Sequence, residues 1–349
     1  MSSTPRSNWK NLLRWLPGVL ISAIALYAVF KLVQFQDLKT AFSTASWKFL
    51  VVLFLMDVAS LLIRGKAWQV ILGKGVTWTQ SFFGINEGYL LNNLFPLRAG
   101  EIGRSIFVGK ASGLGTFQVL SSIVIERAFD ISFAAILALL TLPLVVGLAW
   151  IKTTAWTILV VVFAGLLSLF FVARNQQKVI GWLEKLTAGR VFFEKYLLSP
   201  IRKLIQGFAT LTNPKQFFLS FFWMGCSWFS WFVIYNVMVR QILPDAPLWA
   251  GAFVGAILAL GAAIPSAPAA LGVYEAAIVA SVVVLGGNES SALAYAIIMH
   301  VMQFVTVGIF GVWGLIREGQ SLQSLFSAAN FNEGSTDPQA SIVEDKETK

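Results

Sequence analysis

The chain has few charged residues and almost no residues that commonly bind metals through sulfur or nitrogen. Only 12% of its 349 residues are Asp, Glu, Lys or Arg, about half the share found in soluble domains. It contains one cysteine and one histidine, which argues against a disulfide within this sequence and against a zinc site of the usual ligands. We therefore expect no metal and no other cofactor. His300 lies in the last apolar run, and we interpret it as a hydrogen-bonded packing residue rather than as a proton relay.

Apolar residues, by contrast, make up 57% of the sequence, and the mean hydropathy is +0.73. This composition is typical of a protein whose solvent is the lipid bilayer. Six runs approach or exceed the ~20 apolar residues that a spanning helix needs, at about 15–33, 47–63, 128–149, 155–173, 216–239 and 291–316. The first run is longer than the apolar core of a signal peptide, so we expect it to remain as an anchor.

The basic residues predict how the chain crosses the membrane. The net charge of +9 comes from Lys and Arg that flank the apolar runs, a position that favours lipid headgroups over nucleic acid as the partner. If the N-terminus is cytoplasmic, 21 of the 26 basic residues fall on the cytoplasmic side. We therefore predict an integral protein of the plasma (inner) membrane with both termini in the cytoplasm.

Two more apolar regions, 79–120 and 248–287, are interrupted by Pro, Gly and charge. Each must enter and leave the membrane on the same side, either as a re-entrant hairpin or as two full crossings. The first opens from the cytoplasm and the second from outside, so the halves 47–149 and 216–316 form an inverted repeat. We expect an all-α polytopic membrane protein with about six spanning helices and two broken hairpins, which is typical of a transport site near the midplane.

The sequence further predicts one transmembrane domain, residues 1–318. The basic and aromatic stretch 174–215 fits either an amphipathic cytoplasmic connector on the headgroups or a solvated loop. The tail 319–349 is polar and acidic and has little to bury. We expect the tail to be mostly disordered and cytoplasmic.

The first interrupted region contains the stretch "LNNLFPLRAGEIGRS". Pro96 lacks an amide hydrogen and Gly100 loosens the backbone, so we expect a helix break here. Backbone groups freed at such a break must be satisfied by protein or water. Asn92 and Asn93 supply side-chain donors and acceptors for this purpose and are candidate substrate-binding residues.

Three charged residues follow the break at a spacing of three: Arg98, Glu101 and Arg104. On a helix this spacing brings neighbouring members near one face, and we expect Glu101 to bridge the two arginines. Guanidinium groups arranged in this way can hold a phosphate through paired hydrogen bonds. The alternative is that these charges simply mark a cytoplasmic loop.

The motif "IERAFD" places Glu126, Arg127 and Asp130 at the start of the next apolar run. Ionisable residues in a span cost about 2.5–3.5 kcal/mol each and usually pair or line a polar cavity. Either a substrate site or a structural salt-bridge cluster would explain them.

The second interrupted region contains "GAAIPSAPAALGVYEAA". Here we expect Pro265, Pro268 and Gly272 to break the helix, and Tyr274 and Glu275 to face the substrate. Glu275 has no basic neighbour in the sequence. We therefore predict that it approaches the arginines of the first motif and pairs with one of them.

Together, the segments "NNLFPLRAGEIGRS", "ERAFD" and "IPSAPAALGVYEAA" resemble the integral-membrane domain of the lysylphosphatidylglycerol synthetase family, over roughly residues 10–318. The second segment has Ala269 and Ala270 where glycines are common in that family. The soluble aminoacyl-transferase domain of the family has no counterpart in this sequence. The resemblance implies a flippase-like role.

The function that we expect is therefore a non-enzymatic lipid translocase or lipid transporter for a polar or anionic headgroup. A membrane-embedded transferase acting on lipid-linked sugar or aminoacyl lipid is one alternative, and an ion-coupled carrier of small solutes is another. Membrane lipids, most of all anionic ones, are the expected partners, and a separate lipid-modifying synthase is compatible with the sequence. The oligomeric state is open.

Overall fold

The structure is a computed structural model that describes residues 46–95, 98–145, 174–187, 212–263 and 266–317, with a few residues between 27–43 and 156–208. Every regular element in these ranges is a helix, which confirms the prediction of an all-α membrane protein. The expected anchor at 15–33 and the tail 319–349 lie outside the described residues, apart from Tyr27 in the anchor. About half of the run at 155–173 lies outside them as well.

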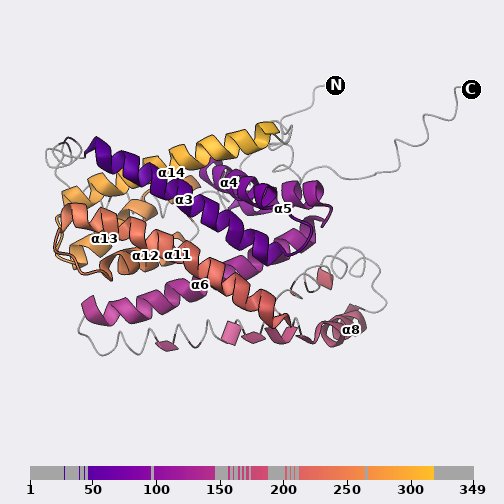
Figure 1. Cartoon of the computed structure of the whole chain (residues 1–349). Helices are drawn as coiled ribbons and strands as arrows, with labels where there is room; N and C mark the ends of the chain where they lie inside the picture. Colours follow the sequence, from indigo (N-terminus) through magenta and orange to yellow (C-terminus); the bar gives the residue numbers. More distant parts are fainter. Residues whose placement is uncertain are drawn as a thin grey trace, which may run out of the picture.

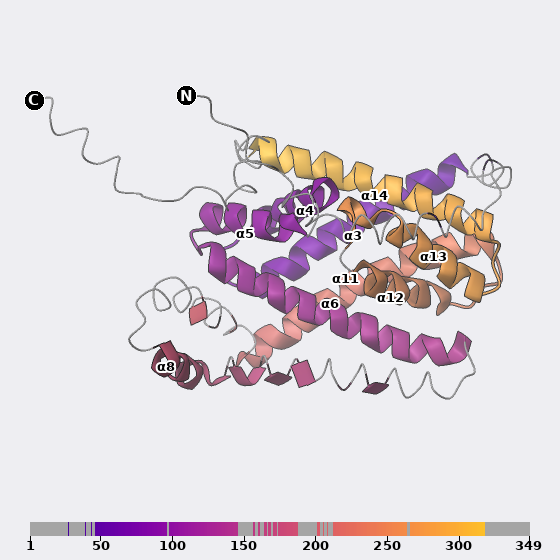
Figure 2. The same ribbon diagram turned by 180° about the vertical axis from the view of Figure 1, so that it is seen from behind.

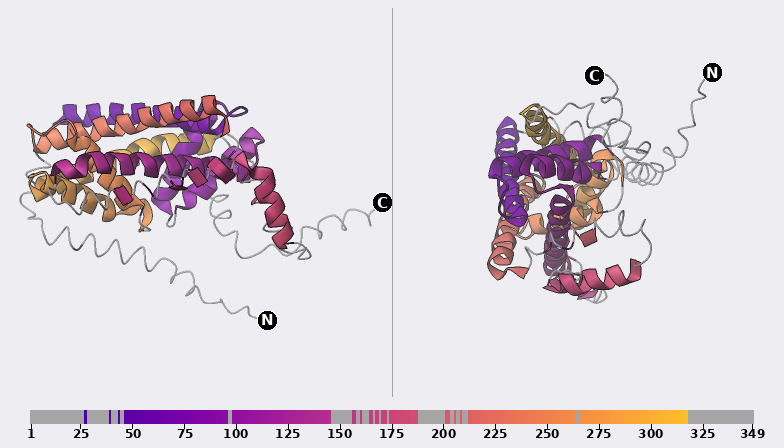
Figure 3. Two further views of the ribbon diagram at one scale, coloured as in Figure 1. Left: turned by 90° about the horizontal axis from the view of Figure 1, so that it is seen from below. Right: turned by 90° about the vertical axis from the view of Figure 1, so that its right-hand side faces the viewer.

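Four long helices lie lengthwise beside one another: α3 (Trp47–Leu72), α6 (Thr116–Val145), α11 (Pro214–Ile242) and α14 (Glu289–Arg317) (Figures 1 and 3). Of these, α6, α11 and α14 are apolar and long enough to cross a membrane. The 26 residues of α3 extend about 39 Å at ~1.5 Å per residue. Both α3 and α6 run beyond the predicted limits, at Leu72 and Thr116, because their charged turns remain helical inside the protein.

Two pairs of short helices lie between the long ones. The first pair is α4 (Trp78–Leu94) and α5 (Ala99–Ser112), and the second is α12 (Ala250–Ala262) and α13 (Val273–Val284). Each short helix measures about 18 to 26 Å at ~1.5 Å per residue, less than the ~30 Å hydrocarbon core. The pairs occupy opposite ends of the bundle (Figures 1 and 2). Each pair is therefore a re-entrant hairpin rather than two full crossings.

The first hairpin begins at a capping box, in which Thr77 and Gln80 each accept a hydrogen bond from the other's backbone amide. The helix α4 ends two residues before Pro96, which lies outside the described residues. Arg98 then adopts a left-handed conformation with φ 55° before α5 starts. The prediction that Gly100 lies at the break is wrong, because Gly100 lies in the first turn of α5. Its role is close packing, because a Cβ there would lie 1.8 Å from the Gly88 carbonyl oxygen.

The second hairpin turns through a short 3₁₀ helix, η3 (Pro268–Ala270). Pro268 starts this turn, and Pro265 lies outside the described residues. Ala269 and Ala270 both have positive φ, 58° and 55°, and Gly272 has φ 82°. Two alanines thus adopt the left-handed backbone conformation that glycine would adopt freely. This conformation has a steric cost of about 1–2 kcal/mol for each alanine.

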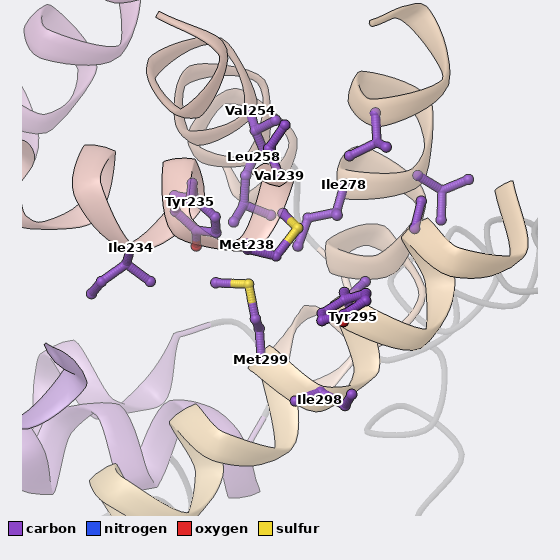
Figure 4. Packing of buried hydrophobic residues seen from close by; sticks show 14 of the residues in the cluster. Ile234, Tyr235, Met238, Val239, Val254, Leu258, Ile278, Tyr295, Ile298 and Met299 are labelled. Carbon is purple, nitrogen blue, oxygen red and sulfur yellow. The ribbon is translucent and has the colours of Figure 1, made fainter. Parts of the chain in front are cut away.

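The largest apolar core packs α11, α12, α13 and α14 against one another (Figure 4). Met238 of α11 and Met299 of α14 point toward each other in its centre, beside Ile278 of α13. Glycines allow close approach elsewhere: a Cβ at Gly251 of α12 would lie 2.4 Å from the Asn236 backbone nitrogen of α11. Small residues at helix contacts are characteristic of membrane bundles.

Part of the predicted connector, Gln176–Thr187, forms the helix α8. It lies at the end of the bundle where the first hairpin enters (Figures 1 and 2). Glu184 of α8 forms an ion pair with Arg202. This placement agrees with the predicted topology, in which the connector and the open end of the first hairpin share one side.

Candidate functional site: a polar cavity between the two hairpins

The tips of the two hairpins meet inside the bundle. Arg98, at the first tip, donates a hydrogen bond of 2.6 Å from Nη2 to the carbonyl oxygen of Ala262, at the end of α12. Beside this contact lies a cavity of about 420 Å³ that both tips line, together with side chains of α11 and α14. Residues about 165 positions apart in the chain thus form one site.

A buried ion-pair cluster lies behind the first tip. Arg64 of α3 donates to both carboxylate oxygens of Asp130, at 2.8 and 2.6 Å, and to Glu126 at 2.5 Å. Arg104 of α5 donates to the other oxygen of Glu126 at 2.6 Å and lies over the ring of Trp68. The side chains of Arg64, Arg104 and Glu126 are at most 5% exposed. Such pairing is what makes charges tolerable at this depth.

From this cluster the charges continue to the cavity. Arg127 contacts Asp130 at 3.1 Å and Glu101 at 3.0 Å, and Glu101 lies 3.7 Å from Arg98. The Arg98 side chain is 44% exposed. The whole chain of contacts contains four guanidinium groups and three carboxylates, so it leaves one net positive charge. Its most exposed member is Arg98, which lines the cavity together with Glu101 and Arg127.

The second tip is held by a different pair. Glu275 Oε1 lies 2.6 Å from His300 Nδ1, and Glu275 Oε2 accepts a hydrogen bond of 2.7 Å from the Gly272 amide. The other ring nitrogen of His300 lies 3.1 Å from the carbonyl oxygen of Ala269. Tyr274 stacks on the imidazole with ring centroids 4.1 Å apart.

The structure divides the predicted substrate residues into two groups. Six of them line the cavity: Asn92, Asn93, Arg98, Glu101, Arg127 and Tyr274. The other four stand behind the lining: Arg104, Glu126, Asp130 and Glu275. Asn92 has an additional local role, because its side-chain oxygen accepts the Gly100 amide hydrogen at 2.9 Å and so ties α4 to α5.

Two predicted pairings are wrong. Glu101 does not bridge Arg98 and Arg104, because six residues span about 1.7 helical turns and Arg104 therefore points toward Glu126 instead. Glu275 does not pair with an arginine of the first motif, because His300 of the neighbouring helix α14, 25 residues later in the chain, lies beside it.

Sequence reasoning missed several cavity and cluster residues. Arg64 organises the buried cluster, and His300, Tyr89, Tyr235 and Gln303 line the cavity. Arg64 and His300 carried a usable signal, because an ionisable residue inside an apolar helix needs a partner. The tyrosines and Gln303 carried none, since only the folded structure brings them to the same wall.

The described residues hold no group of three or more His, Cys, Asp and Glu side chains that could bind a metal ion. The polar part of the lining consists of guanidinium, carboxylate, amide, phenol, hydroxyl and imidazole groups around a space of ligand size. Phe95, Trp231, Leu258 and several alanines complete the wall. Its chemistry is that of binding polar or anionic groups.

Fold and site together define a polytopic α-helical membrane protein with two oppositely oriented re-entrant hairpins around a central polar cavity. The chain belongs to the family described as the lysylphosphatidylglycerol synthase TM region, which it matches over residues 15–311. It is also similar to a "UPF0104 membrane protein" of Methanothermobacter thermautotrophicus, with 29% identity over 102 residues. That match spans 29% of this chain and 30% of the archaeal protein.

Proposed function

We propose that the protein is a lipid translocase that accepts an anionic headgroup in the cavity between the hairpin tips and carries out no covalent chemistry. The observation that carries this proposal is the net positive chain of contacts that ends at Arg98 in the cavity. Arg98 is the group with the least internal compensation, since its Glu101 contact is long at 3.7 Å. A planar guanidinium fork suits a phosphate.

The cavity has the size expected for a headgroup. Its volume of about 420 Å³ lies within the ~300–1,000 Å³ usual for small-molecule sites. Asn93, Tyr274 and Gln303 add hydrogen-bonding groups to its wall. A glycerol or amino acid substituent on the phosphate would find partners here.

A separate apolar groove supports a lipid rather than a soluble substrate. It has a volume of about 530 Å³, lies between α6, α11 and α12, and is lined by Phe133, Leu140 and Phe229 among others. Trp228 lines this groove and also donates a hydrogen bond of 3.1 Å to Asp130 of the charge cluster. One side chain thus separates the charges from a surface suited to acyl chains.

The opposed hairpins supply a means of alternating access. In the present conformation the contact between Arg98 and the Ala262 carbonyl joins the tips. Withdrawal of the first tip would open the cavity toward one side of the membrane, and withdrawal of the second would open it toward the other. A headgroup phosphate that binds Arg98 would compete with the Ala262 carbonyl and so weaken the closed state.

The test is transport in reconstituted vesicles that carry fluorescent phosphatidylglycerol or phosphatidylcholine with the same acyl chains. Loss of fluorescence on adding a membrane-impermeant quencher reports the fraction of probe that has crossed. We expect faster crossing of phosphatidylglycerol. The variant Arg98→Ala should slow it about tenfold or more, because a hydrogen bond to a charged group contributes ~1.5–3 kcal/mol.

Lys66→Ala is the matched control, since it removes a positive charge from α3 that contacts Gln69 rather than the cavity. Arg98→Lys should restore little of the activity. Equal crossing in vesicles with and without protein would overturn the proposal. Mass spectrometry of the same lipids would reveal a new covalent product, which would instead support the transferase.

A further inference from the structure

The contacts of His300 determine how many hydrogens the Glu275–His300 pair holds. The Ala269 carbonyl oxygen can only accept, so the nitrogen 3.1 Å from it, Nε2, must carry a hydrogen. A second hydrogen must lie between Nδ1 and Glu275 Oε1, since two lone pairs would repel each other at 2.6 Å. The other carboxylate oxygen already accepts from the Gly272 amide. The pair therefore holds two hydrogens, whereas a neutral histidine beside a carboxylate holds one.

We propose that Glu275 and His300 form a proton-binding site that fastens the tip of the second hairpin. The ligand is a single proton, shared between the carboxylate and the imidazole, and the protonated pair is neutral overall. This proposal goes beyond the proposed function, because it concerns a proton rather than a lipid. It assigns a role to Glu275, which stands behind the cavity lining, and to His300, which belongs to the lining.

Loss of this proton breaks one of the two contacts whichever tautomer results. A hydrogen left on Nε2 places the bare Nδ1 against the carboxylate, and a hydrogen left on Nδ1 places the bare Nε2 against the Ala269 carbonyl. Ala269 and Ala270 lie in the left-handed region, which costs about 1–2 kcal/mol each and persists only where surrounding contacts impose it. Deprotonation therefore frees the tip, and both alanines line the central cavity.

Several other titratable groups lie near the Glu275–His300 pair. Tyr274 stacks on the imidazole ring, and α12 contributes no titratable residue. Asp57 shares a small cavity of about 40 Å³ with Tyr274, so it is the main competing source of a pH effect. Across the cavity, the titratable groups that line it with His300 are Tyr89, Arg98, Glu101, Arg127 and Tyr235. The packed helices add Glu87 of α4 and Tyr295 of α14, the helix of His300 itself.

The first test measures access to the tip. In a Cys226→Ala background, the rate at which a thiol reagent labels Ala270→Cys reports access to the second tip. Asn93→Cys lies on the first hairpin and lines the same cavity, so its labelling rate corrects for the ionisation of the thiol itself. The quantity of interest is the labelling rate of Ala270→Cys divided by that of Asn93→Cys. We expect this ratio to rise about tenfold for each unit of increasing pH until it saturates, as for one shared proton. Glu275→Gln should keep the ratio low at every pH, because its amide can donate to Nδ1 permanently. His300→Ala should keep it high.

Asp57→Asn should leave the pH profile unchanged. A flat profile in the otherwise unmodified protein, or the same pH-dependent profile in Glu275→Gln, would overturn the proposal. A profile that Asp57→Asn abolishes would assign the proton to Asp57 and would overturn it as well.

A second test uses the fact that the chain has a single histidine. Nitrogen NMR of the ¹⁵N-histidine-labelled protein, purified without a histidine tag, should show Nε2 protonated and Nδ1 hydrogen-bonded at low pH. A ring with Nε2 unprotonated throughout would contradict the site. Neither test measures lipid: pH-dependent labelling without lipid crossing would leave the proton site standing and remove the translocase, and the reverse result would do the opposite.

Discussion

The charged residues of the first half differ mainly in how deeply they are buried, and this difference predicts their roles. Arg64 touches two carboxylates and is 5% exposed, whereas Arg98 touches one at 3.7 Å and is 44% exposed. A buried ion whose partner is removed remains as an uncompensated charge. An exposed one regains water. The same residue type should therefore act on stability in one position and on binding in the other.

We predict that Arg64→Ala lowers the free energy of unfolding by about 3–5 kcal/mol, because it leaves Glu126 and Asp130 partly unpaired. Arg98→Ala should change it by less than about 1 kcal/mol, the usual range for an exposed ion pair. Thermal unfolding in detergent, with equal protein amounts, measures both. Equal destabilisation by the two variants would show that Arg98 belongs to the structural cluster rather than to the binding site.

The sequence predicted which charged side chains share the polar site, but it did not predict all of their partners. The motifs identified Arg98, Glu101 and Arg127 as side chains that share a polar site. They did not identify Arg64 or His300 as the partners. Arg64 is separated from its carboxylate partners by 62 and 66 residues in the chain, and His300 is separated from Glu275 by 25. A helical wheel describes neighbours within one helix, and the choice among helices depends on the packing of the bundle.

Among the secondary-structure elements, the hairpins carry the site and depend on close helix packing. At the first tip, Gly88 of α4 and Gly100 of α5 face each other so closely that each lacks room for a Cβ. At the second, two alanines occupy left-handed positions. Interrupted hydrophobicity predicted where both hairpins lie. It did not predict that their tips touch, since nothing in either segment specifies the register of the other.

Gly100→Ala should destabilise the first hairpin strongly. The new Cβ would lie 1.8 Å from the Gly88 carbonyl oxygen, which is backbone and cannot rotate away, and overpacking of this kind costs about 1–3 kcal/mol or more. Gly308→Ala in α14 is the control, because nothing lies within 4 Å of its added methyl group. The yield of folded protein and the thermal midpoint are the measurements, and a neutral Gly100→Ala variant would refute the close packing.

Ala269→Gly should stabilise the protein, in contrast to Gly100→Ala. Glycine adopts φ 58° without steric penalty, so removal of the Cβ should stabilise the tip by about 1 kcal/mol. Ala256→Gly, in the middle of α12, should instead destabilise by about 1 kcal/mol. Comparison of their thermal midpoints checks the prediction. If both variants were destabilised equally, the left-handed conformation of Ala269 would be contradicted.

Considered as a whole, the protein places two hairpins of opposite orientation at opposite ends of one bundle, with their tips at a common cavity. The positive-inside rule assigns the first hairpin to the cytoplasmic end, together with α8. This assignment remains a prediction of the sequence. The structure adds that the two hairpins enter from opposite ends of the bundle of long helices (Figures 1 and 2).

Cysteine labelling of intact cells tests the assignment. In a Cys226→Ala background, Asn288→Cys, at the open end of the second hairpin, should react with a membrane-impermeant thiol reagent. Lys110→Cys, at the open end of the first, should react only after the membrane is opened. Both side chains are exposed. The reverse pattern would invert the topology, and labelling of both from outside would contradict the opposed hairpins.

The most direct measurement is to locate the headgroup itself by photo-crosslinking. A phosphatidylglycerol with a photoreactive group on its glycerol headgroup would be incorporated into vesicles with the protein, beside a phosphatidylcholine probe of the same design. We predict crosslinks to peptides of both hairpin tips, residues 89–104 and 262–274, that are stronger for phosphatidylglycerol and are lost in Arg98→Ala. Crosslinks confined to lipid-facing residues such as Leu140 and Phe229, unchanged by Arg98→Ala, would contradict the central cavity as the site of headgroup binding.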